Sequence, residues 1–267
     1  ADRGAFTARY GLDQGTAALY GDAWSLWWSG YPDQGFNRAR EALLLTEELN
    51  HPFTTAWTLV WYSLLHVYRR EVDPVDHLAD ELITLADEQQ FAQAAGLGRI
   101  VRGWVDTFRG QSEQGIETMR EGIAGWTGTG ARLMVSHWYT FLADAYGRAN
   151  KPTEGLRLVS LALSEVEATG QRSYEVEIYW VRGELLSMTP GMEGESQTCY
   201  RRAIEVAQKQ GSRSLGLRAA NSLARALAST GKRDEAPAAL GCRYEWFTEG
   251  FDTPDLEDAK SLIAGLT

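Results

Sequence analysis

The amino-acid sequence predicts an all-α protein: a right-handed α-α superhelix of about six helical hairpins, closed by a capping helix at its C-terminal end. Three observations predict this fold class. A pattern of small residues recurs with a period of about 40 residues, apolar residues follow helical spacing within each period, and turn-forming residues separate the segments. Few stretches show the strict alternation of apolar and polar residues that a half-buried strand needs.

Each period carries a small residue at a fixed place in its second half, followed by apolar or small residues four and seven positions later. The first example is Gly35, Ala39 and Ala42. In steps of 40 or 41, the place of Gly35 is then taken by Val75, Gly115, Gly155, Ser196 and Ala236. About twelve residues before each of these stands another small residue: Ala23, Ser63, Gly103, Ala143, Gly183 or Ala224. Two helices approach to about 8–10 Å only where the side chains at their crossing are small. The pattern therefore predicts paired helices, and because one pair cannot bury its apolar face alone, the pairs must stack.

Taken in chain order, apolar spacing without internal proline predicts the individual helices. First helices of pairs are expected at about 16–29, 54–69 and 135–149, and second helices at about 35–49 and 153–169. Pro152 stands where a second helix begins, and there its missing N–H costs nothing. Turn chemistry joins the helices at Gly30-Tyr31-Pro32-Asp33, Asp73-Pro74, Arg109-Gly110-Gln111, Asn150-Lys151-Pro152, Thr189-Pro190-Gly191 and Thr230-Gly231-Lys232.

The period also predicts the domain organisation, a single helical-repeat domain over residues 1–267. The repeats are expected at about 14–50, 51–91, 92–130, 131–171, 172–212 and 213–243, with a cap at 244–267. In the cap, Trp246, Phe247 and Phe251 are expected to pack over the apolar end of the last repeat, because terminal repeats need such cover.

Composition narrows the classes of partner. The chain has 267 residues, 44% of them apolar, and its 26 basic and 36 acidic residues give a net charge of −10. So acidic a chain repels phosphate backbones and anionic lipid, which argues against nucleic acid and membrane as partners. No apolar run is long enough to span a bilayer. Two cysteines cannot form a disulfide framework, so we expect a cytoplasmic location, and the N-terminus without Met indicates a piece of a longer protein.

The spacing of small residues resembles the tetratricopeptide repeat. In the fourth period Ala143, Tyr146, Gly155 and Ala162 stand at the eighth, eleventh, twentieth and twenty-seventh places of that motif. The period of 40 exceeds the usual 34 of the family and implies longer helices or loops. The second period departs from the motif at Val75 and Leu82, and the sixth places Pro237 directly after its small residue.

A closer likeness lies in the strings Trp24–Gln34, Ala143–Gly147, Arg182–Leu186 and Trp246–Leu256. Together they are similar to the C-terminal repeat region of large bacterial signalling proteins, in which a nucleotide-cyclase or DNA-binding domain precedes a signal-transducing P-loop ATPase. The likeness implies a regulatory or sensor module rather than the catalytic part. It implies no cofactor.

The sequence shows no clear catalytic or metal-binding constellation. It contains no G-x-x-x-x-G-K-[ST] motif, and neither Cys199 nor Cys242 has a His at helical spacing, so both are interpreted as small core residues. His66 and His77 could form a metal site with nearby acidic residues, but acidic residues are also expected at a helix N-terminus, and a solvated loop is the favoured interpretation. That acidic set is Asp73, Asp76 and Asp80. We therefore expect no catalytic residue, no metal, no cofactor and no enzymatic activity.

The resemblance also implies a concave groove, lined by the second, fifth, ninth, twelfth and thirteenth places of the first helices. The aromatic residues at these places fall mainly in the N-terminal half: Tyr20, Trp24, Trp27, Trp28, Trp57, Tyr68, Trp104 and Phe108, with Trp180 further on. The polar ones fall in the C-terminal half: His137, Asp144, Arg148, Glu184, Arg218, Asn221 and Arg225. The rings could instead fill the core, and the charges could form ordinary ion pairs. Arg218 and Arg225 stand seven residues apart on one helix face, the arrangement best suited to an anion or carboxylate clamp.

The functional hypothesis is a non-catalytic sensor or protein-interaction module. It would bind a peptide, a partner domain of the same full-length chain or a small effector in the groove, and regulate an output domain outside this chain. Two alternatives stay open. One is an oligomerisation scaffold whose aromatic half is covered in a homodimer. The other is an oligosaccharide-binding domain of a transcription regulator, because similar repeats occur in the family of maltotriose-responsive activators.

Overall fold

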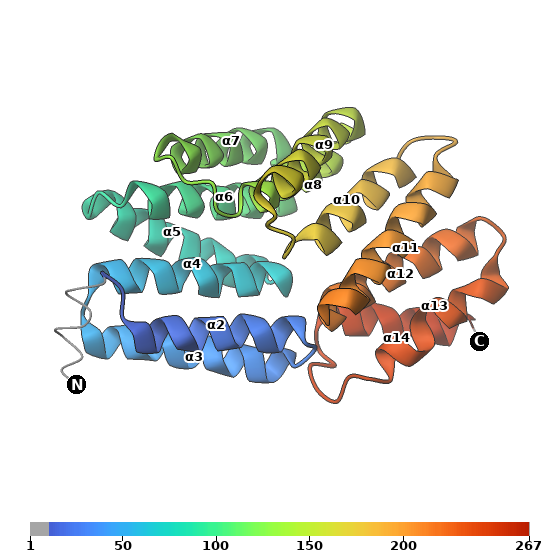
Figure 1. The fold of residues 1–267 in the computed structure, drawn as a ribbon, viewed down its shortest axis with the longest axis horizontal. Coiled ribbons are helices and arrows are strands. Elements are labelled where there is room, and N and C mark those ends of the chain that lie inside the picture. Colours follow the sequence, from blue (N-terminus) through green and yellow to red (C-terminus); the bar gives the residue numbers. More distant parts are fainter. Residues whose placement is uncertain (1–10, 267) are drawn as a thin grey trace. The chain divides into compact units, whose positions relative to one another are not determined.

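The computed structural model describes residues 11–266, which form thirteen α-helices and one short 3-10 helix and contain no strand (Figure 1). The prediction of an all-α array of helical hairpins is confirmed. The first helices of the pairs are α2 (Gln14–Trp28), α4 (Pro52–Tyr68), α6 (Ala92–Phe108), α8 (Val135–Arg148), α10 (Glu175–Ser187) and α12 (Arg213–Ser229). The second helices are α3 (Pro32–Leu49), α5 (Val72–Glu88), α7 (Ser112–Gly128), α9 (Pro152–Thr169), α11 (Glu193–Gln210) and α13 (Ala236–Tyr244), the last preceded by the 3-10 helix η1 (Arg233–Glu235). The cap is α14 (Pro254–Leu266).

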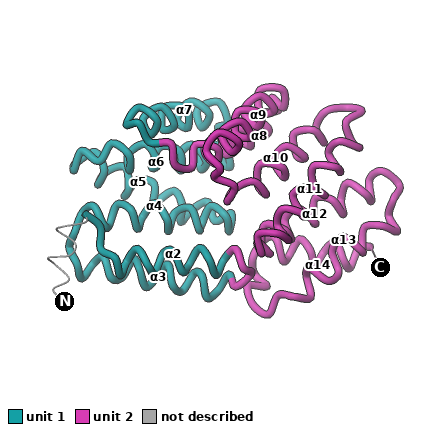
Figure 2. The backbone as a smooth tube through the Cα atoms, viewed as in Figure 1, with its two compact units in different colours: residues 1–27, 32–131 teal, residues 28–31, 132–267 magenta. Residues whose placement is uncertain are grey.

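The chain divides into two compact units, shown in different colours in Figure 2. Unit 1 consists of residues 1–27 and 32–131, and unit 2 of residues 28–31 and 132–267. Within each unit, successive helices pack side by side: α5 lies against α6 in unit 1, and α11 lies against α12 in unit 2. The expectation of one domain over the whole chain stays a prediction.

The small residues of the 40-residue pattern lie where the two helices of a pair cross. A Cβ atom added to Gly35 would lie 2.8 Å from the carbonyl oxygen of Ala23, and one added to Gly155 would lie 2.9 Å from that of Ala143. Both distances are too short for a real Cβ atom, so the backbones touch at these places. The steric interpretation is therefore confirmed at these two crossings.

Left-handed residues close the turns with the same period. Inside the hairpins the residues with positive φ are Gly30, Arg70, Gly110, Asn150, Gly191 and Gly231, and between successive hairpins they are Asn50, Gln90, Gly130, Gly170 and Gly211. Glycine and asparagine are the residues that adopt this backbone conformation most readily, and they commonly end helices. Pro152 occupies the first turn of α9, as predicted.

The last pair is shorter than the others. Pro237 lies in the first turn of α13, which has only 9 residues, and α14 packs on both α12 and α13 to cover the end of unit 2. Phe247 is buried in this cap and Trp246 is half-buried. Phe251 is 49% exposed, but its ring contacts that of Tyr244 at a centroid distance of 6.1 Å, so it packs in the cap only in part.

Among the described residues, no helix is both long enough and apolar enough to cross a membrane.

Candidate functional site

A row of polar side chains follows the first helices of unit 2. Asp144 on α8, Glu184 on α10 and Arg225 on α12 all stand one residue after the small residue of their helix, the ninth place of the repeat. All three are at least partly exposed. In unit 1 the same place is held by Leu64 and two tryptophans, which are buried. Unit 2 therefore presents a polar, accessible row at a place where unit 1 is packed.

Two members of this row line a groove in unit 2 with a volume of about 280 Å³. Glu184 and Arg225 meet there with Glu193 and several hydroxyl groups; the other lining residues are Ser187, Ser196, Tyr200, Ser222, Ala226, Ser229 and Thr230. The Tyr200 hydroxyl donates to Glu184 Oε1 at 2.7 Å and thereby fixes this carboxylate at the groove. Burial raises the pKa of Tyr200, so its hydroxyl stays a donor at neutral pH. The groove thus offers charges of both signs among hydrogen-bonding hydroxyls.

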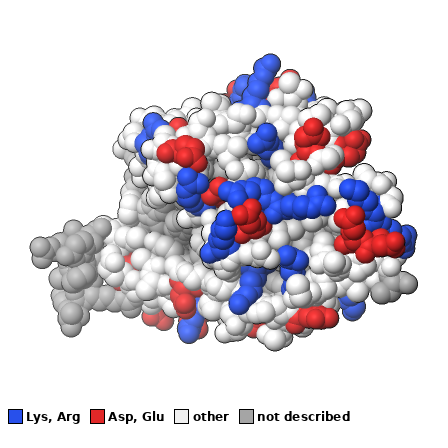
Figure 3. All heavy atoms as spheres, turned by 45° about the vertical axis from the view of Figure 1, so that its right-hand side comes forward, with Lys and Arg blue, Asp and Glu red and all other residues white. Residues whose placement is uncertain are grey.

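The charges on the surface of this region are mixed rather than segregated. In Figure 3 basic and acidic side chains lie next to one another on the face turned toward the viewer. Asp144 bonds Arg148 Nε at 2.9 Å, and Arg225 bonds Asp258 at 2.9 Å. These pairs are partly exposed and contribute little to stability, so they can exchange their partners for those of a ligand.

A chain of buried charges lies among the first helices and the cap of unit 2. Arg218 on α12 is only 6% exposed and bonds Asp255 Oδ2 on α14 at 2.9 Å. Its second guanidinium nitrogen lies 3.9 Å from Glu177 Oε1 on α10, which is 5% exposed. Glu177 Oε2 lies 3.3 Å from His137 Nδ1 on α8. These contacts link four helices of unit 2 through ionisable groups that are shielded from water, which makes them a structural device rather than an open clamp.

Aromatic and amide groups surround this chain. The His137 ring is fully buried and stacks on the Tyr174 ring, with centroids 3.8 Å apart. Burial raises the pKa of Tyr174 far above its ordinary value. Asn221 donates from Nδ2 to the Asp255 carbonyl at 2.8 Å, and the Arg218 guanidinium lies 5.4 Å from the centroid of the Trp180 ring. The buried groups thus hold the cap helix α14 against α12.

The aromatic residues expected in the groove of unit 1 mostly pack against one another. Trp24 is 5% exposed and its ring contacts Tyr68, and Trp104 is also 5% exposed and contacts Phe108 at a centroid distance of 4.1 Å. Trp27 is buried as well, and the half-buried members of the set are Tyr20, Trp57 and Phe108. In unit 2, Trp28 is half-buried against Tyr174, and Trp180 donates from Nε1 to Ser222 Oγ at 3.0 Å. These contacts favour the core-packing alternative for Trp24, Trp27 and Trp104.

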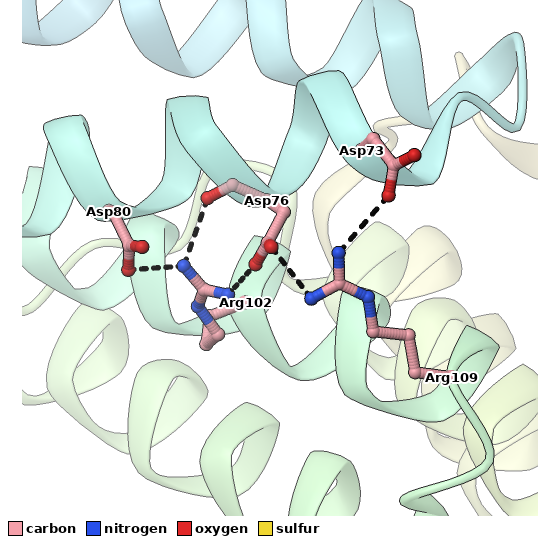
Figure 4. A network of polar contacts seen from close by, with 5 residues as sticks. All are labelled: Asp73, Asp76, Asp80, Arg102 and Arg109. Carbon is pink, nitrogen blue, oxygen red and sulfur yellow. Dashed lines mark hydrogen bonds and ion pairs between the residues drawn. The ribbon is translucent and has the colours of Figure 1, made fainter.

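The acidic cluster considered as a metal site forms ion pairs instead (Figure 4). Asp73, Asp76 and Asp80 all lie on α5; Asp76 bonds Arg109 Nη1 at 2.6 Å and also pairs with Arg102. Asp73 and Asp80 keep exposed side chains, whereas that of Asp76 is only 18% exposed, so a solvated loop describes this set poorly. His66 is buried and pairs with Glu71. Among residues 11–266, no group of three or more His, Cys, Asp and Glu side chains is placed to hold a metal ion.

Acid should remove the contribution of Asp76 to stability. Burial raises the pKa of Asp76, but the hydrogen bonds from Arg109 and Arg102 lower it further, so the pKa lies below its ordinary value. A carboxyl whose pKa is lowered on folding stabilises the fold above its unfolded pKa and loses that contribution as pH falls through the folded value. We expect Asp76→Asn to lower the free energy of unfolding by about 1.5 kcal/mol at about pH 7 and by much less at about pH 2, because the contribution is lost only as the pH falls below the ordinary aspartate pKa toward the lowered value of the folded carboxyl. Urea unfolding at the two pH values measures this difference, and Asp73→Asn, at an 86% exposed side chain, is the control. An equal loss at both pH values would contradict the assignment.

Glu177, Asp255 and Tyr174 were not predicted from the sequence as members of the site. Glu177 stands at the second place of the fifth repeat, the same place as His137 and Arg218 in the repeats on either side, so the repeat frame could have identified it. Asp255 lies in the cap outside the repeat frame, and no signal in the sequence pairs it with Arg218. Of the two cysteines, Cys199 is buried as predicted, while Cys242 is exposed, so its interpretation as a core residue is wrong.

Comparison with known proteins gives distant similarities. No family model matches the chain. A stretch of 201 residues, 75% of the chain, is 21% identical to an uncharacterized protein of Rhizobium meliloti (strain 1021), and it corresponds to 20% of that protein. The chain thus spans about one fifth of the length of the curated relative that it matches.

Two solved structures of TPR-like repeats from a kinesin light chain-like protein of Podosopora anserina are also similar. One is 11% identical with a TM-score of 0.47 and covers 73% of this chain and 95% of its own. The other is 13% identical with a TM-score of 0.43 and covers 93% of this chain and 95% of its own. The assignment of helical hairpins rests on the helix pairs and their crossings described above.

Proposed function

We propose that this chain is a non-catalytic helical-repeat interaction module whose polar groove in unit 2 binds a peptide segment of a partner protein or partner domain. The observation that carries the proposal is the polar row at the ninth place of successive first helices, two members of which line the groove. A row that repeats along an array of hairpins suits an extended ligand, because each hairpin presents the same place to the next stretch of the ligand.

The chemistry of the groove favours a peptide over a purely apolar ligand. An extended peptide presents backbone N–H and C=O groups that need partners when water is removed. The hydroxyls of Ser187, Ser222 and Ser229 can supply such partners, while Glu184 and Arg225 select charged side chains of opposite sign. An oligosaccharide is less well served, since the tryptophans that would stack on sugar rings are largely packed inside unit 1.

The module would regulate an output domain beyond this chain when its groove is occupied. The matched region makes up one fifth of the Rhizobium relative, which leaves room in that protein for further domains. A sensor of a small soluble ligand and a scaffold that docks a partner protein would both fit this arrangement. Because we propose a peptide as the ligand, we propose the docking scaffold.

Selection from a random peptide library, followed by fluorescence anisotropy with the recovered peptides, tests the proposal. We expect Glu184→Arg and Arg225→Glu each to weaken binding by about tenfold, because each reverses a charge that faces the ligand. Arg120→Glu is the matched control, since Arg120 is an exposed arginine on the second helix α7 of unit 1. Recovery of no peptide, or affinities that both reversals leave unchanged, would refute the groove as a peptide site.

A further inference from the structure

Unit 2 contains a second pocket, lined by α11, by the start of α12 and by residues in and after α13. Its volume is about 290 Å³. Its apolar wall is formed by Ile204, Ala207, Gly216 and the ring of Trp246, and its polar lining by Gln208, Ser212, Arg213 and Arg243. It shares no lining residue with the polar groove, so the inference drawn from it goes beyond the proposed function.

Two arginines line this pocket without a carboxylate partner among the described residues. The Arg213 guanidinium lies 3.5 Å from the centroid of the Trp246 ring and donates to the Ser29 carbonyl at 3.2 Å. Arg243 donates to the Ala239 carbonyl at 2.8 Å. Most other arginines of this acidic chain pair with Asp or Glu, so two unneutralised guanidinium groups at one pocket are unusual here. A guanidinium group binds carboxylate and phosphate through paired hydrogen bonds.

A third polar group points to the same kind of ligand. Ser212 immediately precedes α12, is 6% exposed, and its hydroxyl has no hydrogen-bond partner among the described residues. It makes no side-chain hydrogen bond to the start of the helix. A buried hydroxyl without a partner is costly, and α12, with 17 residues, directs the positive end of its dipole toward this place. An anion in the pocket would accept from the hydroxyl and be stabilised by the dipole.

We propose that this pocket binds a small amphipathic anion, with its carboxylate or phosphate head group between Arg213, Arg243 and Ser212 and its apolar body against Ile204, Ala207 and Trp246. The volume lies near the lower end of the range of about 300–1,000 Å³ for small-molecule sites, so the ligand is a metabolite-sized molecule rather than a macromolecule. The apolar wall of the pocket contacts the apolar part of the ligand, and the two arginines bind its anionic group. A ligand with only one of these parts would not fill the site.

Cys242 provides a local reporter for the test. It lines the pocket and is exposed, whereas Cys199, also in unit 2, is buried and lies outside the pocket. A ligand in the pocket should therefore slow the reaction of Cys242 with N-ethylmaleimide and leave Cys199 unaffected. Mass spectrometry of the labelled chain resolves the two thiols.

The probes are phenylacetate and phenyl phosphate. 2-Phenylethanol is the control for the apolar part without a charge, and acetate and inorganic phosphate are the controls for the anionic groups alone. We expect at least one of the two aromatic anions to protect Cys242, and isothermal titration calorimetry to show that Arg213→Met and Arg243→Met each weaken its binding by about tenfold. Arg182→Met, at an exposed arginine on α10, is the control and should leave the dissociation constant unchanged. Circular dichroism checks that each variant is folded.

The two aromatic anions distinguish the source of the head group: tighter binding of one identifies a carboxylate or a phosphate ligand, and either result supports the site. Protection of Cys242 by neither anion, equal protection by 2-phenylethanol, or unchanged affinity in both arginine variants would overturn the proposal. Because Glu184→Arg and Arg225→Glu do not touch this pocket, failure of the peptide proposal leaves the result here unaffected.

Discussion

Replacing Arg218 by methionine is expected to lower the free energy of unfolding by about 3–5 kcal/mol. The variant keeps the volume of the side chain but removes a cation that lies between Asp255 and Glu177, and both carboxylates are largely shielded from water. A buried charge that loses its partner keeps its desolvation cost without compensation. The cap helix α14, which bonds α12 through Asp255, should be the first element to open.

The chain offers a matched control for this variant. Arg225 lies seven residues further along α12 and bonds Asp258 on the same cap helix, but the two side chains are 46% and 36% exposed. Arg225→Met should therefore change the free energy of unfolding by about 1 kcal/mol or less. Urea unfolding followed by circular dichroism compares the two variants, and Arg218→Lys gives an intermediate loss should Arg218→Met fail to fold. Equal losses for Arg218→Met and Arg225→Met would show that burial does not set the strength of these pairs.

The helix pairs could be predicted from the sequence because their cause is local and periodic. The small residues recur every 40 or 41 positions, and a side chain would collide with the backbone of the partner helix at four of them, Gly35, Gly103, Gly115 and Gly155. The left-handed turn residues recur with the same period, and the glycines and asparagine inside the hairpins were a second signal, already used as turn chemistry. Arg70 and Gln90 could not have been identified in this way, because neither residue type favours that conformation.

The contents of the site were harder to predict than the helices. The repeat frame placed Asp144, Glu184 and Arg225 on accessible faces, and in the structure they remain accessible. The same frame placed Arg218 and Asn221 there, but both are buried because α14 packs over them, and the position of a capping helix is not encoded in the repeat. Trp24 and Trp104 lie at the same ninth place as Glu184, and only contacts with neighbouring helices decide that the rings are covered and the carboxylate is not.

These differences separate two roles within unit 2. The second places of its first helices hold the buried His137, Glu177 and Arg218, which connect the helices to one another and to the cap. The ninth places hold Asp144, Glu184 and Arg225, whose side chains remain accessible to solvent. A partner that bound at the ninth places would therefore meet a surface whose geometry is fixed by the charges beneath it, and preorganisation of this kind reduces the entropic cost of binding.

Replacing Gly115 by alanine is expected to destabilise unit 1 by about 2 kcal/mol, although alanine is the better helix former. A Cβ atom at Gly115 would lie 2.5 Å from the Gly103 carbonyl oxygen and 2.7 Å from Thr107 Cγ2. The oxygen belongs to the backbone of α6 and cannot rotate away, so the two helices of the pair must separate, and overpacking of this kind costs up to about 3 kcal/mol. The gain in helix propensity is about 1 kcal/mol and does not offset it.

Gly125 also lies on α7, but there we expect substitution by alanine to stabilise the protein. It is exposed, and the nearest atom to an added Cβ is the Gly96 Cα at 3.7 Å, an ordinary van der Waals contact. Gly125→Ala should therefore raise the free energy of unfolding by up to about 1 kcal/mol, through helix propensity and the reduced freedom of the unfolded chain. Thermal and urea unfolding of the two single variants measure both effects. Opposite signs for the same substitution on one helix would show that helix crossing, rather than composition, requires glycine at the repeated position, and stabilisation by Gly115→Ala would refute the close approach of α6 and α7.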